Sequence, residues 1–123
     1  MKIAVCSQGD SLKSPVDGRF GRCSYLIVTD TETGESEVHP NPALSSSHGA
    51  AVATVQFLSS QGVEVVLAQN LGPNAVSALG ATGISVYSPE GKTVEEALAA
   101  YQEGRAKEHT GATVSSHSGL YRK

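Results

Sequence analysis

The sequence predicts one α/β domain built on a mixed sheet of five strands flanked by helices. With 123 residues, 39% of them hydrophobic, the chain is long enough to bury a single core without disulfides or metals to support it. The first part of the chain shows three strand patterns in succession. The later part alternates helix and strand patterns, and such alternation predicts right-handed parallel crossovers.

The first three predicted elements are strands at residues 2–6, 25–30 and 35–39. Residues 33–34, Thr-Gly, form a turn signal, so the second and third strands are expected to pair as a hairpin. Residues 40–42, Pro-Asn-Pro, should end that hairpin, because neither proline can donate a hydrogen bond to a neighbouring strand.

From residue 49 onwards, each helix pattern is bounded by residues typical of helix ends. Serines and a histidine at residues 45–48 are candidate N-caps for the first helix, and Gly62 is placed to terminate it. Pro73 suits the first position of the second helix, and residues 93–96 form a capping box that opens the third. The predicted elements are a helix at 49–60, a strand at 63–68, a helix from 73 to about 80, a strand at 84–87 and a helix at 94–101.

Residues 1–104 are expected to form this single domain, and residues 105–123 a mobile tail without periodicity. We expect no targeting leader, because Met1 and Lys2 run directly into the first strand, and no apolar run reaches the roughly 20 residues of a membrane span. The two cysteines form neither a disulfide framework nor a CxxC pair. A cytoplasmic protein with reduced thiols is therefore expected.

The net charge of −3 is small, but its distribution is uneven. Residues 1–29 carry a balance of +2 and residues 30–108 a balance of −7, so bulk attraction to nucleic acid or to an anionic membrane is not expected. The phosphate-binding GxxxxGK[ST] and GxGxxG loops, the GxSxG elbow and a metal-binding carboxylate cluster are all absent. The sequence therefore shows no catalytic set, and we expect no enzyme.

The strongest candidate site is the segment Asp17-Gly-Arg-Phe-Gly-Arg-Cys23. Arg19 and Arg22 offer forks of donors for an anion, and Gly18 and Gly21 allow a ligand to approach backbone amides. If the first strand points up, four strands end at one edge of the sheet, the edge at which open α/β sheets bind ligands. That edge gathers the loops at 7–22, 40–48, 69–72 and 88–92. The alternative is that both arginines are solvated, one of them paired with Asp17.

Two further groups of residues are expected at the same edge. Cys6 is most simply a small buried side chain, whereas arginines beside Cys23 would favour its thiolate. Asn70, Gly72 and Asn74 frame a helix N-terminus, which explains them as turn and cap residues and would also face an anion. The full candidate set is Ser7, Gly18, Arg19, Phe20, Gly21, Arg22, Cys23, His48, Asn70, Gly72 and Asn74, with Cys23, Cys6 and His48 as candidate metal ligands.

Several of these segments together resemble the dinitrogenase iron–molybdenum cofactor biosynthesis family, which includes NifX and the C-terminal domain of NifB. They are Met1–Val5, Phe20–Cys23, Gly62–Val66, Gly72–Ala75, Gly83–Val86 and Thr93–Ala97. The resemblance covers residues 1–104, and the Asp17–Cys23 segment is most similar to that of the orange protein of sulfate reducers. It implies a ribonuclease H-like three-layer fold and a carrier that binds a metal–sulfur cluster non-covalently, with a molybdenum–copper sulfide as the favoured cargo.

One departure from the family bears on the mechanism. Many members carry histidine directly before Phe-Gly, whereas this chain has Arg19, which favours electrostatic capture over histidine ligation. Two other hypotheses stay open from the sequence. The chain could be a regulatory module that binds a protein partner, such as an ATPase, without a metal cluster, or a thiol-dependent redox enzyme that uses Cys23.

Overall fold

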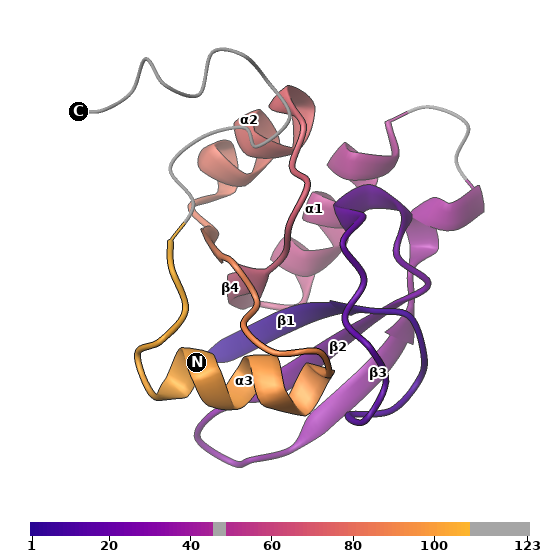
Figure 1. Ribbon diagram of the computed structural model, residues 1–123. Helices are drawn as coiled ribbons and strands as arrows, with labels where there is room; N and C mark the ends of the chain where they lie inside the picture. The colour runs from indigo at the N-terminus through magenta and orange to yellow at the C-terminus, as the bar shows by residue number, and fades with distance from the viewer. Residues whose placement is uncertain (46–48, 109–123) are drawn as a thin grey trace.

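The computed structural model describes residues 1–45 and 49–108. Five strands form one sheet in the order β3-β2-β1-β4-β5, so the first strand of the chain lies at its centre (Figure 1). The strands are β1 (Lys2–Ser7), β2 (Tyr25–Asp30), β3 (Ser36–Pro40), β4 (Val63–Leu67) and β5 (Ser85–Tyr87).

The strand directions confirm the mixed sheet predicted from the sequence. β1 is antiparallel to β2 and parallel to β4, β2 is antiparallel to β3, and β4 is parallel to β5. β1, β3, β4 and β5 therefore all end at the same edge of the sheet, which we call the carboxyl edge. The loops that follow these four strands are the ones from which a ligand site of this fold is built.

Helices cover both faces of the sheet, which gives the expected three layers (Figure 1). α1 (Ala50–Ser60) and α2 (Pro73–Thr82) pack on one face, and α3 (Val94–Gln102) packs on the other. Alternate side chains of β1 point to opposite faces, so Ala4 and Cys6 join the core under α1 and α2, whereas Ile3 and Val5 join the core under α3. A strand buried on both faces explains why residues 3–6 are all apolar.

The predicted helix boundaries hold for α2 and α3. Pro73 occupies the first turn of α2. The Thr93 hydroxyl accepts a hydrogen bond from the Glu96 N–H at 3.3 Å, and the Glu96 carboxylate accepts one from the Thr93 N–H at 3.3 Å. A further bond from the Lys92 N–H, at 2.7 Å, is the main reason that the pKa of Glu96 is lowered. This reciprocal pair is the capping box that the sequence predicted.

The start of α1 differs from the prediction. Its N-cap is Gly49, which has a φ of +68° and makes no side-chain cap hydrogen bond, instead of a residue from 45–48. Ser45 ends a short 3-10 helix, η2 (Pro42–Ser45), that the sequence did not predict, and residues 46–48 lie outside the described residues. Gly62 follows the helix with a φ of +76°, as expected for a terminating glycine.

Two strands differ from the prediction by one residue: β1 is one residue longer, and β3 is shifted from 35–39 to 36–40. β1 continues to Ser7, and β3 includes Pro40, which pairs with Tyr25. Because β3 has only one neighbour in the sheet, a proline at its end is tolerated although it cannot donate to a ladder. A second 3-10 helix that was not predicted, η1 (Phe20–Arg22), occupies the end of the long loop after β1.

The beginning of the expected tail is held against the sheet. The Ser88 N–H donates to the Lys107 carbonyl at 2.7 Å, and Glu108 forms an antiparallel bridge with Tyr87. Residues 105–108, the first part of the predicted tail, thus make contacts with the end of β5, and residues 109–123 lie outside the described residues. Among the described residues, no helix has the length and apolar character needed to cross a membrane.

Candidate functional site

The long loop after β1 is fastened to the start of α3 over its first half. The Val94 N–H donates to the Ser14 carbonyl at 3.0 Å, and the Glu95 N–H donates to the Leu12 carbonyl at 2.9 Å. These are N–H groups that a helix cannot satisfy internally. The Leu12 and Ser14 carbonyls thus cap α3, and residues 17–22 form the end of the loop at the carboxyl edge, where the side chains of Arg19 and Arg22 are exposed.

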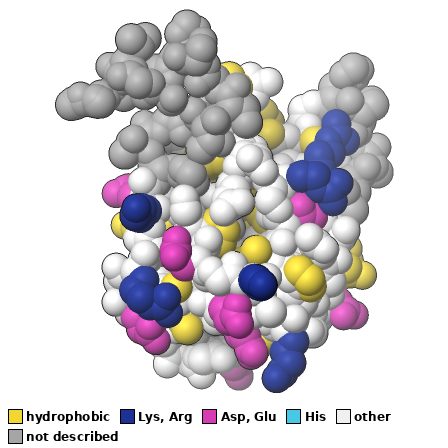
Figure 2. Space-filling model, viewed as in Figure 1, with side chains coloured by type: hydrophobic (Ala, Val, Ile, Leu, Met, Phe, Trp, Pro, Cys, Tyr) yellow, Lys and Arg dark blue, Asp and Glu magenta, His cyan; other side chains and the backbone are white. Residues whose placement is uncertain are grey.

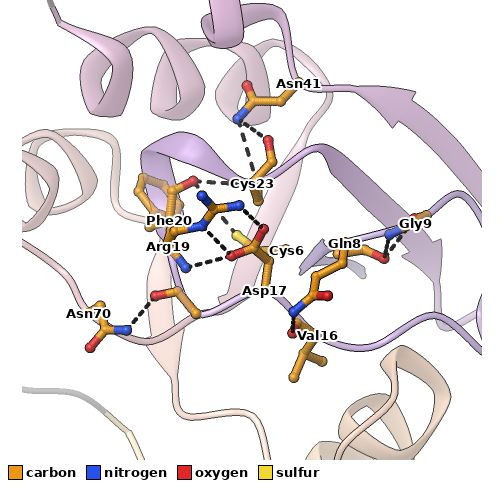
Figure 3. Close-up of polar contacts among 12 residues, drawn as sticks. Cys6, Gln8, Gly9, Val16, Asp17, Arg19, Phe20, Cys23, Asn41 and Asn70 are labelled. Atoms are coloured by element: carbon orange, nitrogen blue, oxygen red, sulfur yellow. Dashed lines mark hydrogen bonds and ion pairs between the residues drawn. The ribbon is translucent and has the colours of Figure 1, made fainter.

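Asp17 and Arg19 form a fixed pair at this edge (Figure 3). The Asp17 carboxylate, 3% exposed, accepts bonds from the Arg19 N–H at 2.9 Å and from Arg19 Nε and Nη2 at 3.0 Å each. Burial by itself would raise the pKa of Asp17, but the side-chain and backbone hydrogen bonds from Arg19 and its charge outweigh burial and lower that pKa. The pairing with Asp17 considered from the sequence is therefore confirmed, and it fixes the direction of the guanidinium.

The two arginines remain available to a ligand despite this pairing. The Arg19 side chain is 65% exposed, and no described residue accepts a hydrogen bond from its Nη1. Arg22 is exposed and makes no ion pair within residues 1–45 and 49–108. Figure 2 shows dark-blue side chains gathered at the upper right beside a single magenta patch. Arg19, Arg22 and Asp17 together carry a net charge of +1.

The turn between β4 and α2 closes the other side of this edge. Asn70 Nδ2 donates to the Gly18 carbonyl at 2.7 Å, a contact that joins positions 52 residues apart (Figure 3). Asn70 is the one residue other than glycine with positive φ in the described part of the chain, at +53°. Gly72 and Asn74 follow at the start of α2, where Asn74 is exposed. The structure thus brings together Gly18, Arg19 and Asn70 as predicted.

Three predicted site residues have structural roles. Phe20 is 2% exposed and belongs to the core under α1 and α2. A Cβ at Gly21 would lie 3.0 Å from the Ala51 backbone nitrogen, so Gly21 allows η1 to approach α1 closely. The Ser7 hydroxyl is buried and is hydrogen-bonded to the Gly9 carbonyl at 2.7 Å and the Gly9 N–H at 3.2 Å. These residues shape the loop without facing a ligand.

The thiols of Cys6 and Cys23 lie close together in the interior of the protein. Cys6 and Cys23 are 1% and 0% exposed, are not joined by a disulfide, and both direct their sulfur at the Phe20 carbonyl, at 3.9 and 3.5 Å. A hydrogen bond with Cys23, followed by burial, raises the pKa of Cys6 well above its usual value. Both thiols are buried, so in this structure Cys23 does not have the accessible position expected of a reactive or metal-ligating cysteine.

Sequence reasoning missed Asn41, a buried residue that holds Cys23 in place. Asn41 Nδ2 donates to the Cys23 carbonyl at 3.0 Å and lies 3.6 Å from its sulfur. Asn41 Oδ1 accepts from the Ala43 N–H at 3.0 Å and from the buried Thr54 hydroxyl at 3.3 Å. Asparagine two residues before a backbone N–H that donates to its side chain is typical of an Asx-turn, so the Asn41-Pro42-Ala43 segment did contain a signal for part of this network.

The histidines do not assemble a metal site in the described structure. His39 Nε2 lies 3.2 Å from Glu37 on β3, and its ring packs edge-on against Phe57. The candidate ligand His48 falls outside the described residues. Within residues 1–45 and 49–108, no group of three or more histidine, cysteine, aspartate or glutamate side chains is placed to hold a metal ion. Among the described residues, the carboxyl edge thus presents guanidinium donors but no such group of metal ligands.

Comparison with known proteins agrees with this architecture. Residues 1–104 match the family described as dinitrogenase iron-molybdenum cofactor. An uncharacterised protein of Methanocaldococcus jannaschii is 32% identical over 108 residues, which span 85% of this chain and 88% of that protein.

Two solved structures share both the fold and substantial sequence identity. The apo form of the orange protein from Desulfovibrio gigas superposes with a TM-score of 0.85 and 37% identity, over 89% of this chain and 93% of that one. A putative NifB protein from Thermotoga superposes with a TM-score of 0.81 and 45% identity, over 91% and 96% of the two chains. The match spans every strand and helix described above, and the chain belongs to the dinitrogenase iron–molybdenum cofactor family.

Proposed function

We propose that this protein is a non-enzymatic carrier or assembly protein for an anionic, molybdenum-containing metal–sulfur cluster. The observation that carries the proposal is the Arg19 guanidinium, fixed by Asp17 yet 65% exposed, next to the exposed Arg22 at the carboxyl edge. Membership of a family described by the iron–molybdenum cofactor supports a cluster as the anion. The likeness to the orange protein makes the molybdenum–copper sulfide that this resemblance implies the first cargo to test.

Charge and hydrogen bonds are the proposed means of retention. Sulfide-rich clusters are anionic and accept hydrogen bonds, and charge-assisted bonds from guanidinium groups are among the stronger ones in proteins. Arg19 can direct Nη1 outward because Asp17 occupies its Nε and Nη2. The enclosed sulfurs of Cys6 and Cys23 are not offered to the cluster in this arrangement. Asn70 and the exposed start of α2 would form the opposite wall.

The proposal is tested by reconstituting the full chain with tetrathiomolybdate and copper salts. We expect a coloured complex with a fixed metal-to-protein ratio after gel filtration, measured by absorbance and elemental analysis. Removing both arginines, as Arg19→Ala with Arg22→Ala, should weaken binding at least tenfold, because each charge-assisted bond contributes about 1.5–3 kcal/mol before solvent screening. Binding should also weaken as salt is raised.

A matched control removes two positive charges elsewhere. Lys13→Ala with Arg105→Ala changes the net charge equally at exposed positions outside residues 17–22. Absence of a complex, or equal loss in both double variants, would contradict the proposed site. If metal-free protein instead captured a protein partner, such as an ATPase, in the presence of chelator, the regulatory alternative would replace the carrier.

A further inference from the structure

A cleft lies on the α3 face, between the amino end of β1 and Tyr87 at the end of β5. It has a volume of about 460 Å³ and is lined in part by Met1, Thr31, Gly104, Ala106 and the tyrosines Tyr87 and Tyr101. Met1 and Thr31 lie beside the amino end of β1, whereas Arg19 lies beyond its carboxyl end. The cleft is formed because the chain leaves α3 and turns back to reach β5, where Glu108 bridges to Tyr87.

Two aromatic rings from different elements meet in this cleft. Tyr87 ends β5 and Tyr101 lies in the last turn of α3, and their ring centres are 4.9 Å apart at 77°. In an edge-to-face pair, the ring that presents its edge keeps its π-face uncovered by its partner. Both tyrosines are only half-buried. A π-face with access to solvent attracts a positively charged group, because the ring quadrupole is negative above its plane.

Carboxylates lie near the rings, and two of the neighbouring cations are already paired: the N-terminal ammonium of Met1 lies 3.4 Å from Glu32, and Arg105 is bound to Glu103. The pKa of Tyr101 is raised, first by burial and then by Tyr87, Glu108 and Glu64, so both glutamates make the environment of this phenol negative. Arg105 is a nearby cation, but its Nε and Nη2 are each bound to Glu103 at 2.9 Å. Lys107 is exposed on the returning segment.

We propose that this cleft binds an arginine or lysine side chain from a basic segment of a partner protein. The rings supply the cation–π surface, Glu64 and Glu108 supply the opposite charge, and the cleft volume accommodates one long side chain. The balance of −7 over residues 30–108 attracts a basic segment to the body of the molecule, whereas the proposed anion site lies within residues 1–29, which carry a balance of +2. The two sites can therefore be occupied independently.

The test uses the full chain, labelled with nitrogen-15, and two peptides of equal shape. Acetyl-Gly-Arg-Gly-amide should shift the amide resonances of residues around Tyr87, Tyr101 and 104–106. The same peptide with citrulline, which is neutral, should bind at least threefold more weakly. Added salt should reduce the arginine shifts, since the attraction is between exposed charges.

Two variants separate the cleft from general surface attraction. Tyr101→Leu should lower affinity about threefold to fivefold, as expected for loss of a cation–π contact, while Tyr25→Leu, a half-buried tyrosine outside the cleft, should not. Glu64→Gln changes an exposed side chain without disturbing the core and should also weaken binding. Equal shifts with both peptides, shifts confined to other surfaces, or full binding in Glu64→Gln and Tyr101→Leu would overturn the proposal. None of these outcomes bears on cluster binding at Arg19 and Arg22.

Discussion

Replacing Asp17 with asparagine tests whether the buried carboxylate organises residues 17–22, the segment that carries Arg19 and Arg22. The substitution keeps the shape of the side chain but removes its charge and one of its two acceptor oxygens. The carboxylate accepts three bonds from Arg19, at 2.9, 3.0 and 3.0 Å. Asparagine can retain the bond to the Arg19 N–H, whereas its amide group would oppose one of the guanidinium donors.

The size of the expected loss of stability follows from how exposed the Asp17 and Arg19 side chains are. Hydrogen bonds to charged groups contribute about 1.5–3 kcal/mol, but the Arg19 side chain is largely solvated, so its share is reduced to roughly that of a surface ion pair. We therefore expect Asp17→Asn to lower the free energy of unfolding by about 1–2 kcal/mol. For a domain of this size, that corresponds to a fall in Tm of roughly 4–8 °C.

Thermal and urea unfolding should be followed by circular dichroism at several pH values. Because the pKa of Asp17 is lowered in the folded protein, its contribution is complete above the unfolded value of about 3.9 and is lost as the pH falls through the folded value. The difference between wild type and Asp17→Asn should thus shrink towards pH 2–3. Asp10→Asn, an exposed change in the same loop, is the control. A variant as stable as Asp10→Asn, or a deficit that persists unchanged at pH 2, would refute the reasoning.

Three further predictions concern packing and the buried thiols. Gly21→Ala should lower the free energy of unfolding by about 1–3 kcal/mol, because the new Cβ would lie 3.0 Å from the backbone of α1. As a control, Gly80→Ala, within α2 and facing open space, should raise that free energy by about 0.5–1 kcal/mol. If chemical denaturation showed that Gly21→Ala is stabilising, this packing would be contradicted. The pKa of Cys6 is raised on folding, so the contribution of this thiol to the free energy of unfolding is complete below its pKa in the unfolded chain, about 8.5, and is lost as the pH rises. The wild-type protein should therefore lose stability between about pH 8 and 10 more steeply than Cys6→Ala. Both Cys6 and Cys23 should react with Ellman's reagent only as fast as the protein opens, and two rapidly titrated thiols in the native state would exclude the enclosed arrangement.

The sequence predicted the strands and helices well because their signals are local. Thr93 and Glu96 are three residues apart and cap the helix that they begin, so their roles require no knowledge of the rest of the chain. The apolar run at residues 3–6 likewise indicated a buried strand without reference to its partners. Alternation of helices and strands then fixed the carboxyl edge as the place for residues 17–22.

The division of roles within the site could not be read from the sequence. Gly18 and Gly21 occupy the same short motif, yet Gly18 meets Asn70 at the carboxyl edge and Gly21 meets the backbone of α1. Each contact spans 30 residues or more, so only the tertiary arrangement distinguishes them. The same holds for Cys23, whose neighbouring arginines suggested a thiolate although Asn41 and the core enclose it.

The central position of β1 also has a consequence for the order in which the protein folds. Its pairing with β2 and the β2–β3 hairpin need only the first 40 residues, whereas its pairing with β4 must wait until residue 67 has been made and must close a much longer loop. Residues 17–22, which carry Arg19 and Arg22, lie between β1 and β2. They can therefore fold together with these two antiparallel strands as the chain emerges from the ribosome. The bond from Asn70 to Gly18 forms only after β4 has docked. One wall of the carboxyl edge is therefore expected to be in place before the chain that supplies the other wall has been synthesised.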